Sequence, residues 1–158
     1  MIKKFLPLIV AFTVIILYTG VMLMYHGSWD SLYAMRHFEG AFFVIFAILK
    51  IINWQGFVSA YRMYDIVAKH SKFYAYLYPL IELALGIAYL TAFQLLMTNI
   101  ITLILMIIGT IGIIQVLARK QKIICACMGA VFKVPMTTVT LIEDLLMGIM
   151  ALMMIILL

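Results

Sequence analysis

Long apolar stretches dominate this chain and restrict the folds that it can adopt. Five of them approach the roughly 20 residues that a helix needs to cross the hydrocarbon core of a membrane, namely Phe5–Met24, Arg36–Ile52, Phe73–Phe93, Met97–Ala118 and Thr137–Leu158. Of all 158 residues 68% are apolar, whereas a soluble domain is about half apolar. The sequence therefore predicts an all-α, polytopic membrane helical bundle that forms a single domain over residues 1–158.

The first two stretches are the least regular of the five. The first follows Lys3 and Lys4, as a signal peptide would, but it is long and no small-residue cleavage pattern follows it. We therefore predict a retained N-terminal anchor. The second is the weakest span, because it begins with Arg36 and Glu39 and ends near Lys50. If this stretch is short or re-entrant, the chain has four spans instead of five.

The basic residues indicate how the bundle is oriented. They lie before the first stretch and in the second and fourth loops. Lys3 and Lys4 precede the first stretch, the second loop contains Arg62, Lys69 and Lys72, and the fourth contains Arg119, Lys120, Lys122 and Lys133. In the first and third loops the only lysine or arginine is Arg36, at a helix end. By the positive-inside rule the N-terminus and the fourth loop are cytoplasmic. Because the basic residues follow a membrane face, no nucleic-acid partner is expected.

The second loop contains an amphipathic segment. Its polar residues share one helical face (Gln55, Ser59, Arg62, Asp65 and Lys69), and Phe57, Tyr61, Tyr64 and Ala68 share the other. We expect one interfacial amphipathic helix here. Aromatic residues on both sides of it fit an aromatic belt at the membrane surface, namely Trp54, Phe73, Tyr74, Tyr76 and Tyr78.

The fourth loop contains the only two cysteines of the chain, Cys125 and Cys127, followed by Met128. A Cys-x-Cys pair closes only a small, strained ring, so it suits redox exchange better than structural stapling. As thiolates, with Met128 as a third ligand, the sulfurs would instead bind a soft metal ion such as Cu(I), Zn(II) or Hg(II). Lys122 and Lys133 flank the pair and favour the thiolate form, which supports either activity. Two inert, packed cysteines are the third interpretation.

Besides Arg36 and Glu39 at the start of the second stretch, four charged residues lie within the predicted spans, namely Lys50, Glu82, Glu143 and Asp144. A charge in hydrocarbon is costly unless it is paired or faces water, so such residues are candidates for function. Counting about 1.5 Å per helical residue places all four in the layer nearest the cysteine loop. We expect them to form a polar cluster beside that loop, which either serves its chemistry or ties the helices together as structural ion pairs.

A second, weaker candidate site lies towards the opposite side of the membrane. It comprises His26, His37 and Glu39, with Met22 and Met24 nearby. Such a set could admit a metal ion, although residues of this kind more often anchor a protein at the interface.

Several separated motifs follow one another in order along the chain. They are residues 42–46, 50–57, 61–66 with 68–69, 78–86, Cys125–Gly129, Val134–Val139 and the pair Glu143-Asp144. From about residue 36 to the end, the chain thereby resembles the MauE/DoxX family of redox-associated membrane proteins. The resemblance implies a four-helix core over residues 36–158 in the bacterial inner membrane, with residues 1–35 as an additional N-terminal span and loop.

The resemblance also has functional implications. The methylamine-utilisation branch of the family is thought to help form disulfides in a periplasmic enzyme subunit, and close look-alikes of this chain are associated with heavy-metal handling. Carried over, it points to Cys125, Cys127, Glu82, Lys50 and Glu143. Thiols at the cytoplasmic face do not fit periplasmic disulfide formation directly. Either the loop is reached from both sides, or reducing equivalents move outwards, or a metal is taken from the cytosol.

Three functions follow from these observations. The leading hypothesis is a thiol-redox membrane protein that passes electrons or disulfides through Cys125 and Cys127 to a partner, at most as a thiol–disulfide oxidoreductase-like accessory. The alternatives are a transport or tolerance protein for a soft heavy-metal ion (Cu, Hg or Zn) and a structural membrane subunit. The expected partners are the lipid bilayer and a thiol-redox or metal-carrying protein. Apart from this soft metal ion, nothing in the sequence requires a cofactor.

Overall fold

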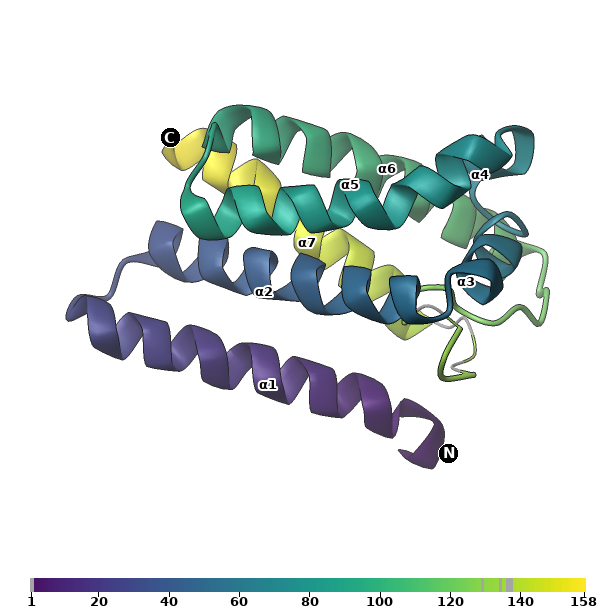
Figure 1. Cartoon of the computed structure of the whole chain (residues 1–158), viewed down its shortest axis with the longest axis horizontal. Helices are drawn as coiled ribbons and strands as arrows, with labels where there is room; N and C mark the ends of the chain where they lie inside the picture. Colours follow the sequence, from purple (N-terminus) through teal and green to yellow (C-terminus); the bar gives the residue numbers. More distant parts are fainter. Residues whose placement is uncertain (1, 129, 134, 136–137) are drawn as a thin grey trace.

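The computed structural model of the protein describes residues 2–128, 130–133, 135 and 138–158. Within them the chain forms seven helices (Figure 1): α1 (Ile2–His26), α2 (Ser31–Ile52), α3 (Trp54–Tyr61), α4 (Ile66–His70), α5 (Lys72–Thr91), α6 (Leu95–Ala118) and α7 (Thr138–Leu157). The described residues contain no strand, and their one extended pairing is an isolated antiparallel bridge between Ile124 and Pro135. The predicted all-α class is confirmed.

The long helices correspond to the five apolar stretches. By length and composition α1, α5, α6 and α7 can each cross a membrane, and α2 joins them when it is counted together with α3. α3 turns away from α2 by 103°, so it lies across the end of the bundle instead of prolonging the span. The protein is thus a multi-pass membrane protein. Thr137, where we expected the last span to begin, lies outside the described residues, as do Gly129, Val134 and Met136 of the family motifs.

α2 lies at the centre of the packing. It contacts α1 on one side, α5 on another, and α7 behind them, while α6 packs against α7 (Figure 1). α1 rests on α2 through Phe12, whose ring meets those of Phe42 at 5.8 Å and Phe46 at 6.3 Å. α1 is therefore a peripheral helix held by aromatic packing.

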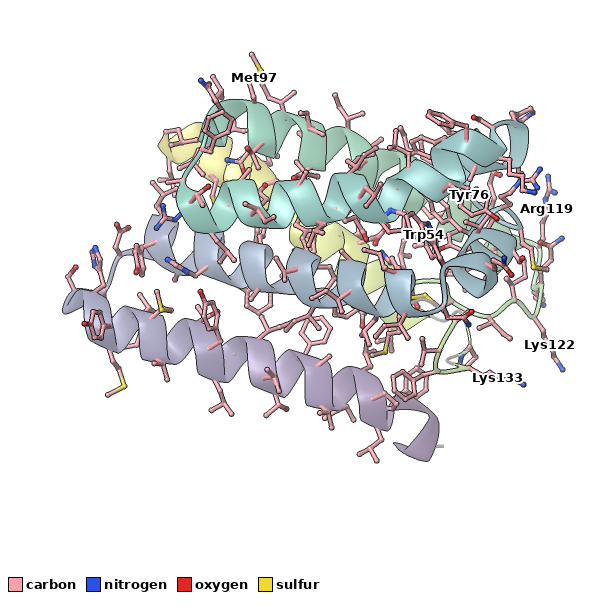
Figure 2. All side chains as sticks on the ribbon, viewed as in Figure 1. Trp54, Tyr76, Met97, Arg119, Lys122 and Lys133 are labelled. Carbon is pink, nitrogen blue, oxygen red and sulfur yellow. A yellow bond between two sulfur atoms is a disulfide. The ribbon has the colours of Figure 1, made fainter. Side chains whose placement is uncertain are left out.

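The two ends of the bundle differ in what they contain. The N-terminus, α3, α4 and the segment between α6 and α7 lie at one end, which we call the cysteine-loop end (Figure 1). The α1–α2 and α5–α6 connections and the C-terminus lie at the other, the far end. Arg119, Lys122 and Lys133 project at the cysteine-loop end, whereas Met97 lies at the far end (Figure 2). The charge asymmetry of the sequence is thus an asymmetry between the ends of the bundle.

The amphipathic segment forms two short helices, α3 and α4, and the expected single helix was wrong. Asp65 breaks it, because its Oδ1 accepts hydrogen bonds from the backbone N–H groups of Val67 at 2.9 Å and Ala68 at 2.8 Å. This is the capping role for which aspartate competes with a continuous helix. Asp65 is therefore fully buried, at 0% exposure, and is not on the exposed polar face where we placed it.

Candidate functional site

The two cysteines lie in the segment that follows α6. Cys125 and Cys127 are joined by a disulfide, and the backbone N–H of Cys127 donates a hydrogen bond to Sγ of Cys125 at 3.2 Å. Cys125 is 1% exposed, whereas Cys127 is only partly buried. The bridge between Ile124 and Pro135 pairs the backbone on either side of the disulfide. An incoming group would consequently reach the sulfur of Cys127 more easily than that of Cys125.

A small cavity of about 40 Å³ lies between this segment and the helices. Ala126 and Cys127 line it on the loop side. The helices contribute all four of the intramembrane charged residues and several aromatic side chains, among them Lys50, Glu82, Glu143, Asp144, Phe57, Tyr61 and Tyr78. Tyr64 joins them from the turn between α3 and α4. A space of this size, lined by polar groups, can hold a water molecule. The disulfide thus has a polar, nearly closed space behind it.

An ion pair joins α2 to α5 in the wall of this cavity. Nζ of Lys50 donates to both carboxylate oxygens of Glu82, at 2.5 and 2.6 Å, and both side chains are buried. The ammonium group also lies 5.1 Å from the ring centre of Tyr78 and 5.5 Å from that of Phe57. Aromatic faces attract a cation, so the rings and the carboxylate together replace the water that Lys50 has lost.

α7 adds two further carboxyl groups to the cavity wall. Glu143 is buried, and Asp144 packs against α6 at Gly109, where a Cβ atom would lie 2.7 Å from Oδ2 of Asp144. A larger residue at position 109 would force the carboxyl group of Asp144 to shift from this place. Among the described residues that line the cavity, Lys50 is the one base and faces three acids. The cavity therefore has excess negative charge unless protons or a cation balance it.

Sequence reasoning missed the tyrosines of this site. Tyr64 lies with its hydroxyl beside the backbone of Ala126, and burial raises the pKa of Tyr64 well above its ordinary value, so the hydroxyl keeps its proton. Tyr78, which we placed in the aromatic belt, is 7% exposed and lines the cavity, whereas Phe73 is 76% exposed. The belt assignment of Tyr78 was wrong. The missed signal is the four-residue spacing of Tyr78 and Glu82, which puts both on one face of α5.

The metal-binding interpretations receive no geometric support from the described residues. Nowhere among them do three histidine, cysteine, aspartate or glutamate side chains gather closely enough to hold an ion. Cys125 and Cys127 are joined to each other, and Met128 beside them is buried. The proposed ligand set of Cys125, Cys127 and Met128 therefore stays a prediction.

The structure does not bring His26, His37 and Glu39 together as ligands. The His26 ring stacks on Tyr33 at 4.2 Å, while Nδ1 of His37 lies 3.2 Å from the Tyr18 hydroxyl. Glu39 is fully buried, and among the described residues neither of its carboxylate oxygens has a well-aligned hydrogen-bond partner, although the Tyr89 hydroxyl lies nearby. These contacts are those of packed aromatic and histidine side chains, and the site stays a prediction.

The comparison with known families identifies the chain. The sequence model described as methylamine utilisation protein MauE matches residues 28–157. This chain belongs to the MauE family. The match confirms the resemblance inferred from the motifs and excludes α1 from the family region. Every residue of the cavity in this MauE-family protein lies within the matched range. No curated protein and no solved structure matches the chain.

Proposed function

We propose that this MauE-family protein exchanges disulfides with a partner protein through Cys125 and Cys127. The supporting observation is that the disulfide and the intramembrane charged residues share one cavity, with Cys127 in its wall. A disulfide that only stapled the loop would need no such neighbours. The family name links the chain to methylamine utilisation, so we infer that the partner is an enzyme subunit or redox protein of that system with paired cysteines.

The exchange would begin at Cys127. A partner thiolate attacks Sγ of Cys127, the bond between the two cysteines breaks, and Cys125 leaves as a thiolate. The backbone N–H of Cys127, which already points at Sγ of Cys125, stabilises that leaving group. The partner's second thiolate then attacks the partner sulfur of the mixed disulfide and releases Cys127. The net result is a partner disulfide and a Cys125/Cys127 dithiol, and the reverse sequence reduces a partner.

The cavity would handle the protons. Two thiolates are released from the disulfide and need two protons to become neutral thiols, while two partner thiols lose two protons. We infer that Glu143 and Asp144, which line the cavity with Cys127, store and return these protons. Lys50 is hydrogen-bonded to Glu82, so it offsets negative charge in the cavity wall and does not itself transfer a proton.

We place the exchange at the cytoplasmic face of the inner membrane, because the cysteine-loop end carries Arg119, Lys122 and Lys133 (Figure 2). A membrane-impermeant maleimide tests this directly, once the disulfide has been reduced. We expect labelling in inside-out vesicles and none in intact cells. Labelling from outside in intact cells would reverse the orientation and make periplasmic disulfide formation the direct interpretation.

Two single variants test the exchange, and the absence of any other cysteine makes them clean. In Cys125→Ser the accessible Cys127 attacks a partner disulfide and cannot be released by its neighbour, so a mixed disulfide should accumulate. In Cys127→Ser the remaining thiol is buried and should trap several-fold less. The measurement is the amount of reducible adduct on non-reducing gels from membranes. Equal trapping by both variants would contradict the order of attack, and trapping by neither would contradict the exchange.

Met128→Leu separates redox exchange from metal binding. It removes a thioether and keeps an apolar side chain of similar volume. Exchange should continue at close to the wild-type rate, and purified wild-type protein should contain less than one equivalent of copper, zinc or mercury by elemental analysis. A stoichiometric metal that is lost in Met128→Leu would support the soft-metal alternative instead.

A further inference from the structure

A second hollow lies outside the bundle at the cysteine-loop end. This pocket, of about 540 Å³, opens between α3 and the start of α5 and is lined by Gln55, Val58, Ser59, Arg62, Lys72 and Tyr76. It shares no lining residue with the cavity behind the disulfide. Two of its six lining residues are cationic and none is acidic. We call it the α3–α5 pocket.

The walls of the α3–α5 pocket are fixed to each other. Nε1 of Trp54, at the start of α3, donates a hydrogen bond to the backbone carbonyl of Tyr76 in α5 at 3.0 Å. The rings of the same two residues meet at 6.3 Å between centres (Figure 2). The pocket is thus built by tertiary contacts and does not depend on the chance positions of surface side chains.

The two cations are held at its rim. Nε of Arg62 donates to the carbonyl oxygen of Ala68 at 3.1 Å, which fixes the guanidinium and leaves its terminal nitrogens for a ligand. The Lys72 ammonium lies 5.9 Å from the ring centre of Tyr76. A guanidinium and an ammonium group that line one pocket match the oxygens of a phosphate.

Among the described residues no acid forms a salt bridge with either cation. Asp65 is the one acid between Gly40 and Glu82 in the sequence. It is fully buried and accepts hydrogen bonds from the backbone N–H groups of Val67 and Ala68. Asp65 is thus engaged in the turn before α4, and it does not line the pocket.

The position of the pocket favours a lipid headgroup over a free phosphate ion as its ligand. α3 turns by 103° at the end of α2 and so runs along the level at which a membrane surface would lie. Trp54, half-buried beside the pocket, is the residue type that prefers the headgroup layer. We propose that the α3–α5 pocket binds the phosphate of an anionic phospholipid headgroup. A zwitterionic headgroup brings its own ammonium group, which Arg62 and Lys72 would repel.

Native mass spectrometry of the full-length protein, released from discs of mixed lipid, tests this proposal. Phosphatidylglycerol should be retained in preference to phosphatidylcholine. Lys72→Gln removes one cation, whose ammonium group makes no hydrogen bond to any described residue, and Arg62→Gln removes the other; each should lower retention by about fivefold. Lys69→Gln is the matched control, because Lys69 is exposed on α4 at the same end and does not line the pocket.

The possible outcomes are distinct. If lipid retention falls as much in Lys69→Gln as in Lys72→Gln, the lipid is attracted by the charged surface as a whole, and the proposed pocket is contradicted. Equal retention of the two lipids would contradict it as well. If millimolar inorganic phosphate displaces the lipid, the natural ligand is free phosphate, and the proposal of a lipid ligand is contradicted. Because Arg62 also holds the α4 backbone, Lys72→Gln decides the matter if Arg62→Gln unfolds.

Discussion

The two halves of the α2–α5 interface bury charge in opposite ways. Towards the cysteine-loop end, Lys50 of α2 meets Glu82 of α5, and a cavity opens beside the pair. Towards the far end, Glu39 of α2 is equally buried, but in the described part of the chain neither carboxylate oxygen has a well-aligned hydrogen-bond partner. Here the helices come close through glycines, since a Cβ at Gly86 would lie 2.9 Å from the backbone nitrogen of Val44.

The difference indicates where chemistry can take place. At the far end α5 is joined to α6 by neutral hydrogen bonds, in which the Tyr89 hydroxyl lies 2.8 Å from Oδ1 of Asn99 and 3.0 Å from Oγ1 of Thr102. The cysteine-loop half keeps space, excess acid and a disulfide together. Tight backbone contact excludes water, whereas long paired side chains hold the helices apart and admit it. We therefore expect disulfide exchange to depend on the cysteine-loop half and the stability of the protein to depend on both halves.

The largest effect is expected from breaking the ion pair. Glu82→Leu leaves Lys50 as an uncompensated buried charge and should lower the free energy of unfolding by about 3–5 kcal/mol. The double variant Lys50→Met/Glu82→Leu should recover most of this loss, because no buried charge is left alone. Thermal unfolding of the purified protein in detergent measures both.

Glu39→Leu is the far-half counterpart and sharpens the comparison. Since Glu39 forms no ion pair with any described residue, its removal should leave stability unchanged or raise it. A loss as large as that in Glu82→Leu would show that Glu39 has a partner of equal importance, and the contrast between the halves would not hold.

A smaller effect is expected from Gly86→Ala. The new Cβ meets backbone atoms, at 2.9 Å from the nitrogen of Val44 and 3.1 Å from the carbonyl oxygen of Gly40, so the helices must separate. Overpacking of this kind costs about 1–3 kcal/mol, again measured by thermal unfolding. Gly148→Ala is the control, because its Cβ would lie 3.5 Å from that of Met106, an ordinary contact, and alanine favours a helix. Equal losses would mean that helix α2 does not approach α5 as closely as described.

Among the variants expected to lose stability, Tyr89→Phe should lose the least, because it removes only one hydroxyl at the far end. Hydrogen bonds between membrane helices contribute about 1 kcal/mol, so stability should fall by that amount. Thiol exchange should stay at the wild-type rate, because Tyr89 does not line the cavity. Tyr25→Phe, on an exposed residue, is the control for the substitution itself. Slowed exchange in Tyr89→Phe alone would connect the two halves and contradict their separation.

Much of the candidate site could be anticipated from charge and position. Lys50 and Glu82 stand out because charged residues are rare in apolar spans, and counting along each helix places them at the same depth. The structure brings these two into contact, and Glu143 and Asp144 into the same cavity; their functional role stays a prediction. Tyr78 and Asp65 could not be placed in this way, because aromatic and capping residues suit both an interface and an interior.

The sequence alone determined the spans, the class and the end that carries the positive charge. These follow from the length of apolar runs and from where charges fall between them, and both properties are local to each segment. Only the tertiary structure decided which helices are neighbours, that Lys50 faces Glu82, and that the disulfide lies against a cavity. Helices in a membrane are all apolar, so their lateral contacts depend on shape, on glycines such as Gly86 and on single polar pairs. Such details become visible only once the helices are packed.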